Sequence, residues 1–262
     1  MATEDDLLPT TPEPNKAWRF DLVLPVLIRP RKAMDRIVKI NRPAWRTPLL
    51  LIVLAAVIAA VVAGSIKAAA ASAGELNLPP DFEFYSPEMQ AQFIQAATAT
   101  NNPTFNYVLP AVGAALGVFV QWFLIGWSLH LILTMLGGRG SSQGAQNIAA
   151  WSALPTLLRS AVQVVAMLAT RQLVVSPGLS GFAPAGEGFG HALLSGILAH
   201  IDIYLIWQIL LLAIGAGLSS RLSRKKSVAA VLATILLVLA LWSLPGALLA
   251  QFNGLNIIRP FF

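Results

Sequence analysis

The stretch AAWSALPTLLRSAVQVVAML, residues 149–168, decides the fold class, because almost all of it is apolar enough to lie inside a lipid bilayer. A helix of roughly 20 residues is long enough to cross a hydrocarbon core of about 30 Å. One charged residue, Arg159, lies near the middle of the stretch. An arginine at membrane depth costs at least about 2.5 kcal/mol on insertion scales. We therefore expect another part of the chain to supply a partner for Arg159.

The composition extends this interpretation to the whole chain. Of the 262 residues, 56% are hydrophobic and 11% are charged, whereas charged residues make up roughly 25% of an ordinary soluble domain. Five apolar segments have about the length of a membrane span, and they cover residues 48–66, 110–136, 148–169, 192–218 and 228–250. The sequence therefore predicts an all-α polytopic membrane protein, with five transmembrane helices in a bundle over residues 48–251.

The positive residues predict the orientation of the bundle. The formal net charge is +6, and most lysines and arginines lie before the first apolar segment, after the second or after the fourth. These three places fall on one side of the membrane if the five spans alternate. By the positive-inside rule, the N-terminus is then cytoplasmic, and the C-terminus, with a short tail over residues 252–262, is extracytoplasmic. Because the positive residues lie beside membrane spans, we do not expect nucleic acid as a partner.

The segment before the first span divides into two parts. Residues 1–15 are acidic, poor in apolar residues and rich in proline and threonine, which predicts a disordered cytoplasmic tail. Residues 16–47 form a basic juxtamembrane segment. Because this long segment precedes an apolar segment of full spanning length, we expect an uncleaved anchor in place of a signal peptide.

A basic amphipathic helix is predicted within residues 16–47. Pro30 suits the first turn of this helix, and Pro43 lies beyond its end. Its basic residues, which we expect to face lipid, are Arg29, Arg31, Lys32, Arg36 and Lys39. The helix either lies along the inner leaflet with its cations on anionic head groups, or packs on the cytoplasmic end of the bundle. The sequence leaves both alternatives open.

The longest connection between spans, residues 67–107, is predicted to contain a short helix on the outer surface. Ser86, Pro87 and Glu88 have the chemistry of a helix N-terminus. The apolar stripe that follows is formed by Met89, Phe93 and Ala97. A lid or a binding site for a partner is also compatible with this segment.

No pattern in the chain predicts catalysis or metal binding. Residues 140–144 form G-x-S-x-G, but that motif marks a nucleophile only on the strand–turn–helix of a hydrolase sheet, and here it joins two membrane spans. Ser141 or Ser142 is better explained as the N-cap of the third span. The three histidines form no close ligand set, and the chain has no cysteine. We therefore expect no enzyme activity, no catalytic residue, no cofactor and no metal.

Three of the predicted spans carry polar residues at helical spacing. They are Gln121 and Ser128 on the second span, Ser152, Thr156, Arg159 and Gln163 on the third, and His191, Ser195 and Asp202 on the fourth. Polar faces of transmembrane helices turn toward the bundle interior and away from lipid. The sequence therefore predicts an intramembrane polar stripe on these helices.

Arg159 and Asp202 are the two formally charged residues that lie at membrane depth away from helix ends. At a rise of 1.5 Å per residue, Arg159 lies about 17 Å from the cytoplasmic end of its span, and Asp202 lies about 15 Å from the outer end of its own. Both depths fall near the middle of a core of about 30 Å. We therefore predict an intramembrane ion pair. The alternatives are a water-filled cavity that solvates the two charges separately, and a protonated Asp202.

Several short patterns follow one another in a familiar order: LIRPRKAMDRI, NRPAW, AAWSALP, HIDIYLIWQILLLAIGAGL and SRKKSVAAV. In this arrangement the chain resembles the bacterial branch of the Yip domain family, the Rab-interacting multi-pass membrane proteins, over roughly residues 24–250. In that family a Gly-Tyr element followed by Pro marks the third span, and Ala150, Trp151 and Pro155 stand in similar places here. The Asp-Leu-Tyr-Gly-Pro element of eukaryotic members has no counterpart, so the resemblance does not extend to Rab binding.

The resemblance implies a five-span bundle in the bacterial inner (plasma) membrane and a role in membrane organisation. We expect a non-enzymatic integral membrane protein that organises partner proteins or lipids. Its expected partners are the anionic lipids of the bilayer and an unidentified membrane or cytoplasmic protein. The alternative is a small transporter, or an ion or proton pathway, through the polar interior at Arg159 and Asp202. A continuous wet path would favour transport, and a closed path would favour the organising role.

Overall fold

The computed structural model describes residues 18–72, 82–184 and 186–252, and within these ranges the chain is helical and contains no β-strand. The elements are η2 (Phe20–Leu22), α1 (Val23–Ile28), α2 (Pro30–Val38), α3 (Arg46–Ser72), η3 (Phe82–Phe84), α4 (Pro87–Thr100), η4 (Thr104–Val108), α5 (Leu109–Met135), α6 (Ser142–Ser152), α7 (Pro155–Thr170), η5 (Ser180–Phe182), α8 (Gly188–Leu198), α9 (Ile203–Ser220) and α10 (Arg224–Phe252). The predicted acidic tail, and all but the first residue of the predicted C-terminal tail, lie outside the described residues.

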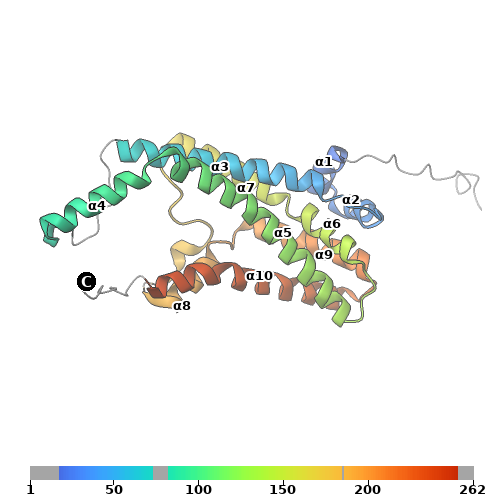
Figure 1. Ribbon diagram of the computed structural model, residues 1–262. Coiled ribbons are helices and arrows are strands. Elements are labelled where there is room, and N and C mark those ends of the chain that lie inside the picture. The colour runs from blue at the N-terminus through green and yellow to red at the C-terminus, as the bar shows by residue number, and fades with distance from the viewer. Residues whose placement is uncertain (1–17, 73–81, 185, 253–262) are drawn as a thin grey trace, which may run out of the picture.

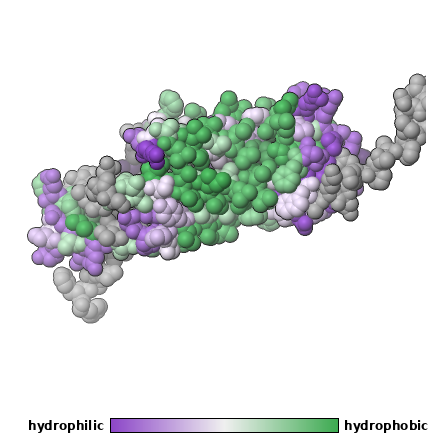
Figure 2. All heavy atoms as spheres, turned by 90° about the horizontal axis from the view of Figure 1, so that it is seen from above, coloured by the Kyte–Doolittle hydropathy of each residue, from purple (hydrophilic) through white to green (hydrophobic). Residues whose placement is uncertain are grey.

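Five helical segments are long and apolar enough to cross a membrane, as predicted. They are Arg46–Ala71, Thr104–Met135, Ser142–Thr170, Ile203–Ser220 and Arg224–Gln251. The helices lie side by side along one long axis (Figure 1). Figure 2 shows a broad apolar surface over the middle of the bundle, with hydrophilic residues at both ends. The protein is therefore an all-α, multi-pass membrane protein.

The described positive residues gather at one end of the bundle, which we call the basic end. It comprises α1, α2, the connection from α5 to α6 and the connection from α9 to α10 (Figure 1). The two connections meet there, because the backbone N–H of Arg139 donates to the Ser220 carbonyl oxygen at 3.2 Å. The opposite end carries Lys67 and Arg171 among the described cations.

The third span is not the continuous helix predicted over residues 148–169. α6 ends at Ser152, two residues turn, and α7 begins with Pro155 as its first residue. Proline has no backbone N–H and its ring collides with the carbonyl of residue i−4, so Pro155 cannot continue α6. Its fixed φ instead suits the first turn of a new helix. At the other end of α6, the Ser141 hydroxyl accepts a hydrogen bond from the Gly144 N–H at 3.0 Å, which confirms the predicted N-cap.

The fourth span is also broken, and the prediction of one helix over residues 192–218 is wrong. α8 and α9 flank a break at residues 199–202. Asp202 has an extended backbone and caps α9, because its Oδ1 accepts hydrogen bonds from the Tyr204 and Leu205 N–H groups at 3.0 and 2.9 Å. Asp202 therefore does not share a helical stripe with His191 and Ser195, which lie on α8.

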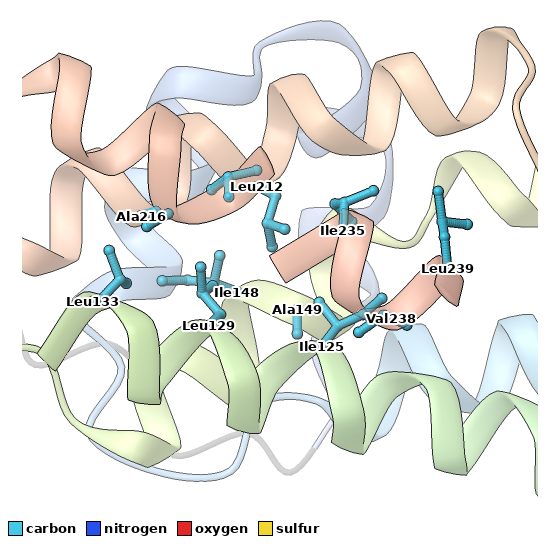
Figure 3. Close-up of a cluster of buried hydrophobic side chains, with 12 residues drawn as sticks. Ile125, Leu129, Leu133, Ile148, Ala149, Leu212, Ala216, Ile235, Val238 and Leu239 are labelled. Carbon is cyan, nitrogen blue, oxygen red and sulfur yellow. The ribbon is translucent and has the colours of Figure 1, made fainter. Parts of the chain in front are cut away.

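A large apolar core fills the half of the bundle nearer the basic end (Figure 3). It joins α5, α6, α9 and α10. Its buried residues are Ile125, Leu129, Leu133, Ile148, Ala149, Leu212, Ala216, Ala230, Val231, Ile235, Val238 and Leu239. This core fixes the four helices relative to one another between the basic end and the polar site described next.

A second apolar cluster attaches α1 and α2 to the bundle. Its buried residues are Leu22, Val26, Ala33, Met34, Ile37, Trp151, Leu154 and Leu211. α2 covers Pro30–Val38 with Pro30 in its first turn, as predicted. Of the two alternatives for this helix, the structure has the second: its apolar face packs on the bundle and is not available to lipid.

The predicted surface helix is α4, which projects away from the bundle at the end opposite the basic end (Figure 1). The Ser86 hydroxyl accepts a hydrogen bond from the Met89 N–H at 3.3 Å, as expected of an N-cap. Phe93 packs against Phe82 with ring centroids 5.5 Å apart, whereas Met89 is exposed. The side chain of Ala97 lies outside the described part of the structure.

Candidate functional site, a polar cavity between two broken spans

Arg159 joins the two broken spans. Its Nε lies 2.8 Å from Asp202 Oδ2, and its Nη2 donates to the Ala199 carbonyl oxygen at 2.8 Å. The Arg159 and Asp202 side chains are 21% and 17% exposed, so protein atoms surround most of the pair. The predicted partners thus lie together, but at a helix break and not between two continuous helices. The Arg159 guanidinium thus contacts the C-terminal end of α8, where the helix dipole favours a cation. It also contacts Asp202 at the N-terminal end of α9, where the helix dipole favours an anion.

Two further carbonyl groups beside the break also have protein partners. Leu198 O accepts a hydrogen bond from the Leu179 N–H at 2.9 Å. The Gly196 carbonyl oxygen lies 2.9 Å from His200 Nδ1, which carries the proton because a carbonyl only accepts. Gly178 permits this packing, since a Cβ there would lie 2.7 Å from the Leu198 and Ala199 oxygens. A break inside a membrane is tolerated when protein satisfies its backbone in this way.

A cavity of about 420 Å³ lies beside the ion pair, among α3, α5, α7, α9 and α10. This volume lies in the range of small-molecule sites, roughly 300–1,000 Å³. The polar residues that line it are Gln121, Thr156, Arg159, Ser160, Gln163, His200, Asp202, Tyr204 and Gln208. The cavity is therefore a polar site inside an apolar bundle.

Three glutamines give this cavity hydrogen-bonding capacity that the described protein does not use. No hydrogen bond joins the side chain of Gln121, Gln163 or Gln208 to another described residue, and Gln208 is only 3% exposed. A second cavity of about 20 Å³, enough for one water molecule, is lined by Gln121, Thr156 and Gln208 among others. None of the polar atoms of these three glutamines is fully buried without a partner, so the atoms face open space in the cavities. We therefore expect water or a polar ligand in both cavities, beside the ion pair.

The structure brings together only part of the predicted polar stripe. Gln121, Thr156 and Gln163 line the cavity with the ion pair. Ser128 and Ser152 are buried, and their hydroxyls donate to carbonyl oxygens of their own helices. His191 and Ser195 lie on α8, outside the lining. Ser128 and Ser152 therefore face the bundle interior, as predicted, but bond to their own helices and do not line the cavity. The break in the fourth span separates His191 and Ser195 from Asp202.

Sequence reasoning missed Ser160, His200, Tyr204 and Gln208 as cavity residues. A signal for two of them was present. Asp followed by an apolar run is a helix-start pattern, and a helix that begins after Asp202 places Tyr204 and Gln208 four residues apart on one face. Treating Asp202 as a residue in the middle of a helix hid this relation.

The cavity ends at the apolar core. Gln121 and Gln208 are its polar residues closest to the basic end, and one turn further along the same helices Ile125 and Leu212 are buried (Figure 3). Buried apolar side chains of α5 and α9 therefore lie between these two glutamines and the basic end.

The segment before the first span is held by two side chains of α6. Asn147 Oδ1 accepts a hydrogen bond from the Ala44 N–H at 2.8 Å, and Asn147 Nδ2 donates to the Arg42 carbonyl oxygen at 2.9 Å. Trp151 Nε1 donates to the Ala44 carbonyl oxygen at 3.0 Å, and the Trp151 ring is fully buried. The patterns NRPAW and AAWSALP, far apart in the sequence, therefore form one contact.

The cations of the predicted basic helix are all exposed at the basic end. They are Arg29, Arg31, Lys32, Arg36 and Lys39. Lys39 Nζ lies 2.7 Å from Asp35, and Arg36 Nη2 lies 3.6 Å from Asp21. A hydrogen bond from Arg19 lowers the pKa of Asp21 below its ordinary value, so this carboxylate keeps its charge into acidic solution. Among the described residues, no salt bridge is formed by Arg29, Arg31 or Lys32.

A family model of the Yip1 domain matches residues 24–245. The chain belongs to the Yip1 domain family. Neither the search of curated proteins nor the search of solved structures found a match. The Yip1 match begins in α1 and ends in α10, so it includes the first four spans and most of the fifth. It also includes the α6 contact with Arg42 and Ala44 and every residue that lines the cavity.

Proposed function

We propose that this Yip1-family protein is a non-enzymatic membrane protein that organises lipids or partner proteins at its basic end. The observation that supports the proposal is the docked pair α1–α2, which buries Val26, Met34 and Ile37 against the bundle while its cations are exposed. A cationic surface held on a rigid bundle is suited to anionic head groups or to an acidic protein surface. The apolar core beneath it suits an organising protein better than a conducting one.

The geometry of the ion pair supports the non-enzymatic part of this proposal. Asp202 Oδ1 accepts hydrogen bonds from the Tyr204 and Leu205 N–H groups, and Asp202 Oδ2 forms the ion pair with Arg159. Arg159 in turn holds the Ala199 carbonyl. Both groups are engaged in closing a helix break, which gives them a structural role and leaves neither poised as a general acid or base.

We further propose that the basic end faces the cytoplasm of a bacterial cell, with the protein in the inner membrane. The charge distribution supports this orientation through the positive-inside rule. Because the chain has no cysteine, single cysteines report on topology directly. Phe84→Cys and Gly186→Cys are expected to react with an impermeant maleimide added to intact cells, whereas Arg139→Cys and Arg224→Cys are expected to react only after lysis. Labelling of Arg224→Cys in intact cells would reverse the orientation.

The organising role is tested by lipid retention in mild detergent. The purified protein is mixed with equal amounts of anionic and zwitterionic lipid, and bound lipid is measured by native mass spectrometry. Arg31→Gln with Lys32→Gln is expected to lower anionic lipid affinity by about tenfold or more, since each cation near such a surface contributes about 1 kcal/mol. The matched control is Lys67→Gln with Arg171→Gln at the opposite end, which is expected to have little effect. Equal retention by the two variants would contradict lipid organisation by α2.

The transport alternative is examined with the same preparation in liposomes. A dye that reports internal pH measures proton leak, and light scattering measures entry of a small polyol. The closed core predicts rates equal to those of empty liposomes, and Gln208→Leu should not change them. A leak that Gln208→Leu abolishes would favour transport over the organising role.

A further inference from the structure

The turn η2 and the helix α1 present an exposed apolar ridge. Phe20, Leu24 and Ile28 recur every four residues, and they are 55%, 62% and 65% exposed. Trp18, also exposed, stacks on Phe20 with ring centroids 6.2 Å apart. The opposite face of the same segment is apolar too, because Leu22 and Val26 are fully buried. A short segment that is apolar on both faces needs a second apolar environment besides the bundle.

The contacts of this segment place it at the level of a membrane boundary. The cluster that holds α1 also contains Ala33, Met34 and Ile37 of α2, whose cations are exposed at the basic end. The start of η2 is fixed to the start of α3, since the Arg19 N–H donates to Thr47 Oγ1 at 2.8 Å. The exposed apolar side chains of α3 begin one turn later, at Leu50. The ridge therefore adjoins the apolar surface that a membrane covers.

We propose that this ridge is an in-plane membrane anchor, inserted at the boundary between acyl chains and head groups of the leaflet at the basic end. The occupant of the ridge is lipid, because the ridge continues the lipid-facing surface of α3 and because cations flank it. Ile28 is followed at once by the exposed Arg29, Arg31 and Lys32. Apolar side chains in the leaflet with cations beside them form the usual pattern of an interfacial segment. The anchor requires only that the bundle spans a membrane, and it does not depend on the proposed organising role.

The anchor changes the role of α2 from that predicted by its amphipathic pattern. α2 does not bury its own apolar face in lipid, since Ala33, Met34 and Ile37 pack on the bundle. Instead, α1 enters the leaflet and carries the cations of α2 to the level of the head groups. Thus α1 supplies the apolar part of the membrane anchor, and α2 supplies its cations.

Spin-label depth measurements test this proposal on the full-length chain in nanodiscs that contain anionic lipid. A label on Leu24→Cys is compared with one on Lys32→Cys, at the exposed cationic surface, and one on Leu236→Cys, an exposed apolar residue within α10. Collision with oxygen, which concentrates in lipid, and with a water-soluble nickel complex is measured for each label. The Leu24 label is expected to resemble the Leu236 label, with several-fold greater access to oxygen than to nickel.

Two outcomes decide the proposal. Lipid-like access at Leu24 together with aqueous access at Lys32 supports an anchor that inserts only its ridge. A Leu24 label as accessible to nickel as the Lys32 label overturns the proposal and leaves a protein as the occupant of the ridge. All three positions are exposed, so labelling there should not disturb the core, and an unchanged thermal transition of each variant verifies this.

Discussion

Replacing Arg159 with leucine is expected to destabilise the folded protein by about 3 to 5 kcal/mol, the usual penalty for breaking a buried pair. The loss has two sources in this structure. Asp202 would lose its 2.8 Å contact in a largely shielded place, and the Ala199 carbonyl oxygen would lose its donor. The free energy of unfolding is measured by titration with SDS in mixed micelles.

The double-mutant cycle with Asp202→Leu separates this pair from its surroundings. Each single change leaves one charge without its partner, whereas the double change removes both charges. The double variant is therefore expected to be more stable than the sum of the single effects predicts. Some loss should remain, because Asp202 also caps α9 and an N-cap contributes about 1 kcal/mol. Additive single effects would mean that the two charges are solvated separately.

Asp202→Asn is the control that distinguishes the cap from the ion pair. Asparagine caps helices about as well as aspartate, so this variant keeps the bonds to Tyr204 and Leu205 but lacks the negative charge. It should lose the coupling to Arg159→Leu and should be more stable than Asp202→Leu. Equal stability of Asp202→Asn and Asp202→Leu would show that the cap contributes little.

Trp151→Ala is expected to cost about 3 to 5 kcal/mol, the range for removing a fully buried large aromatic side chain. Trp151 is 0% exposed and packs from α6 against the segment α1–α2. Its removal should therefore also release α1 and α2 from the bundle and increase proteolysis there. The same SDS titration measures stability, and limited proteolysis followed by mass spectrometry locates the cleavage.

Trp151→Phe is the matched variant for this second prediction. It keeps most of the ring but loses the Nε1 donor to the Ala44 carbonyl oxygen at 3.0 Å, a bond expected to contribute about 1 kcal/mol. Phenylalanine should therefore restore most of the stability that alanine loses. If the two variants were equally unstable, the hydrogen bond and not the packing would be the main contribution of Trp151.

The number of spans was predictable from the sequence, because a run of roughly 20 apolar residues has few stable arrangements other than a membrane-spanning helix. The helix breaks were not predicted, although each carries a local signal. Pro155 in the quoted stretch cannot continue a helix. Asp202 before an apolar run has the chemistry of an N-cap. In both cases continuous hydrophobicity outweighed the local signal in the prediction.

The candidate site was predictable only in part, for a physical reason. Opposite charge and matched depth were sufficient to select Arg159 and Asp202, since unpaired charges are rare inside membranes. The cavity depends instead on how five helices rotate about their axes and on small residues such as Gly113 and Gly117, which line it without filling it. Helix rotation is determined by packing between distant segments and leaves little trace in local spacing. Ser152, for example, has the spacing of the polar stripe and is buried, but its hydroxyl donates to the Ala149 carbonyl oxygen of its own helix and does not line the cavity.

The ion pair between Arg159 and Asp202 also constrains how the chain enters the membrane during synthesis. Arg159 precedes Asp202 by 43 residues, so at about 5 to 20 residues per second the arginine leaves the ribosome roughly 2 to 9 s before its partner exists. Its span is also the least hydrophobic of the five. During that interval the third span has to remain near the insertion machinery or in contact with water. We therefore expect insertion of the third span to be completed only when Arg159 meets Asp202 of the fourth.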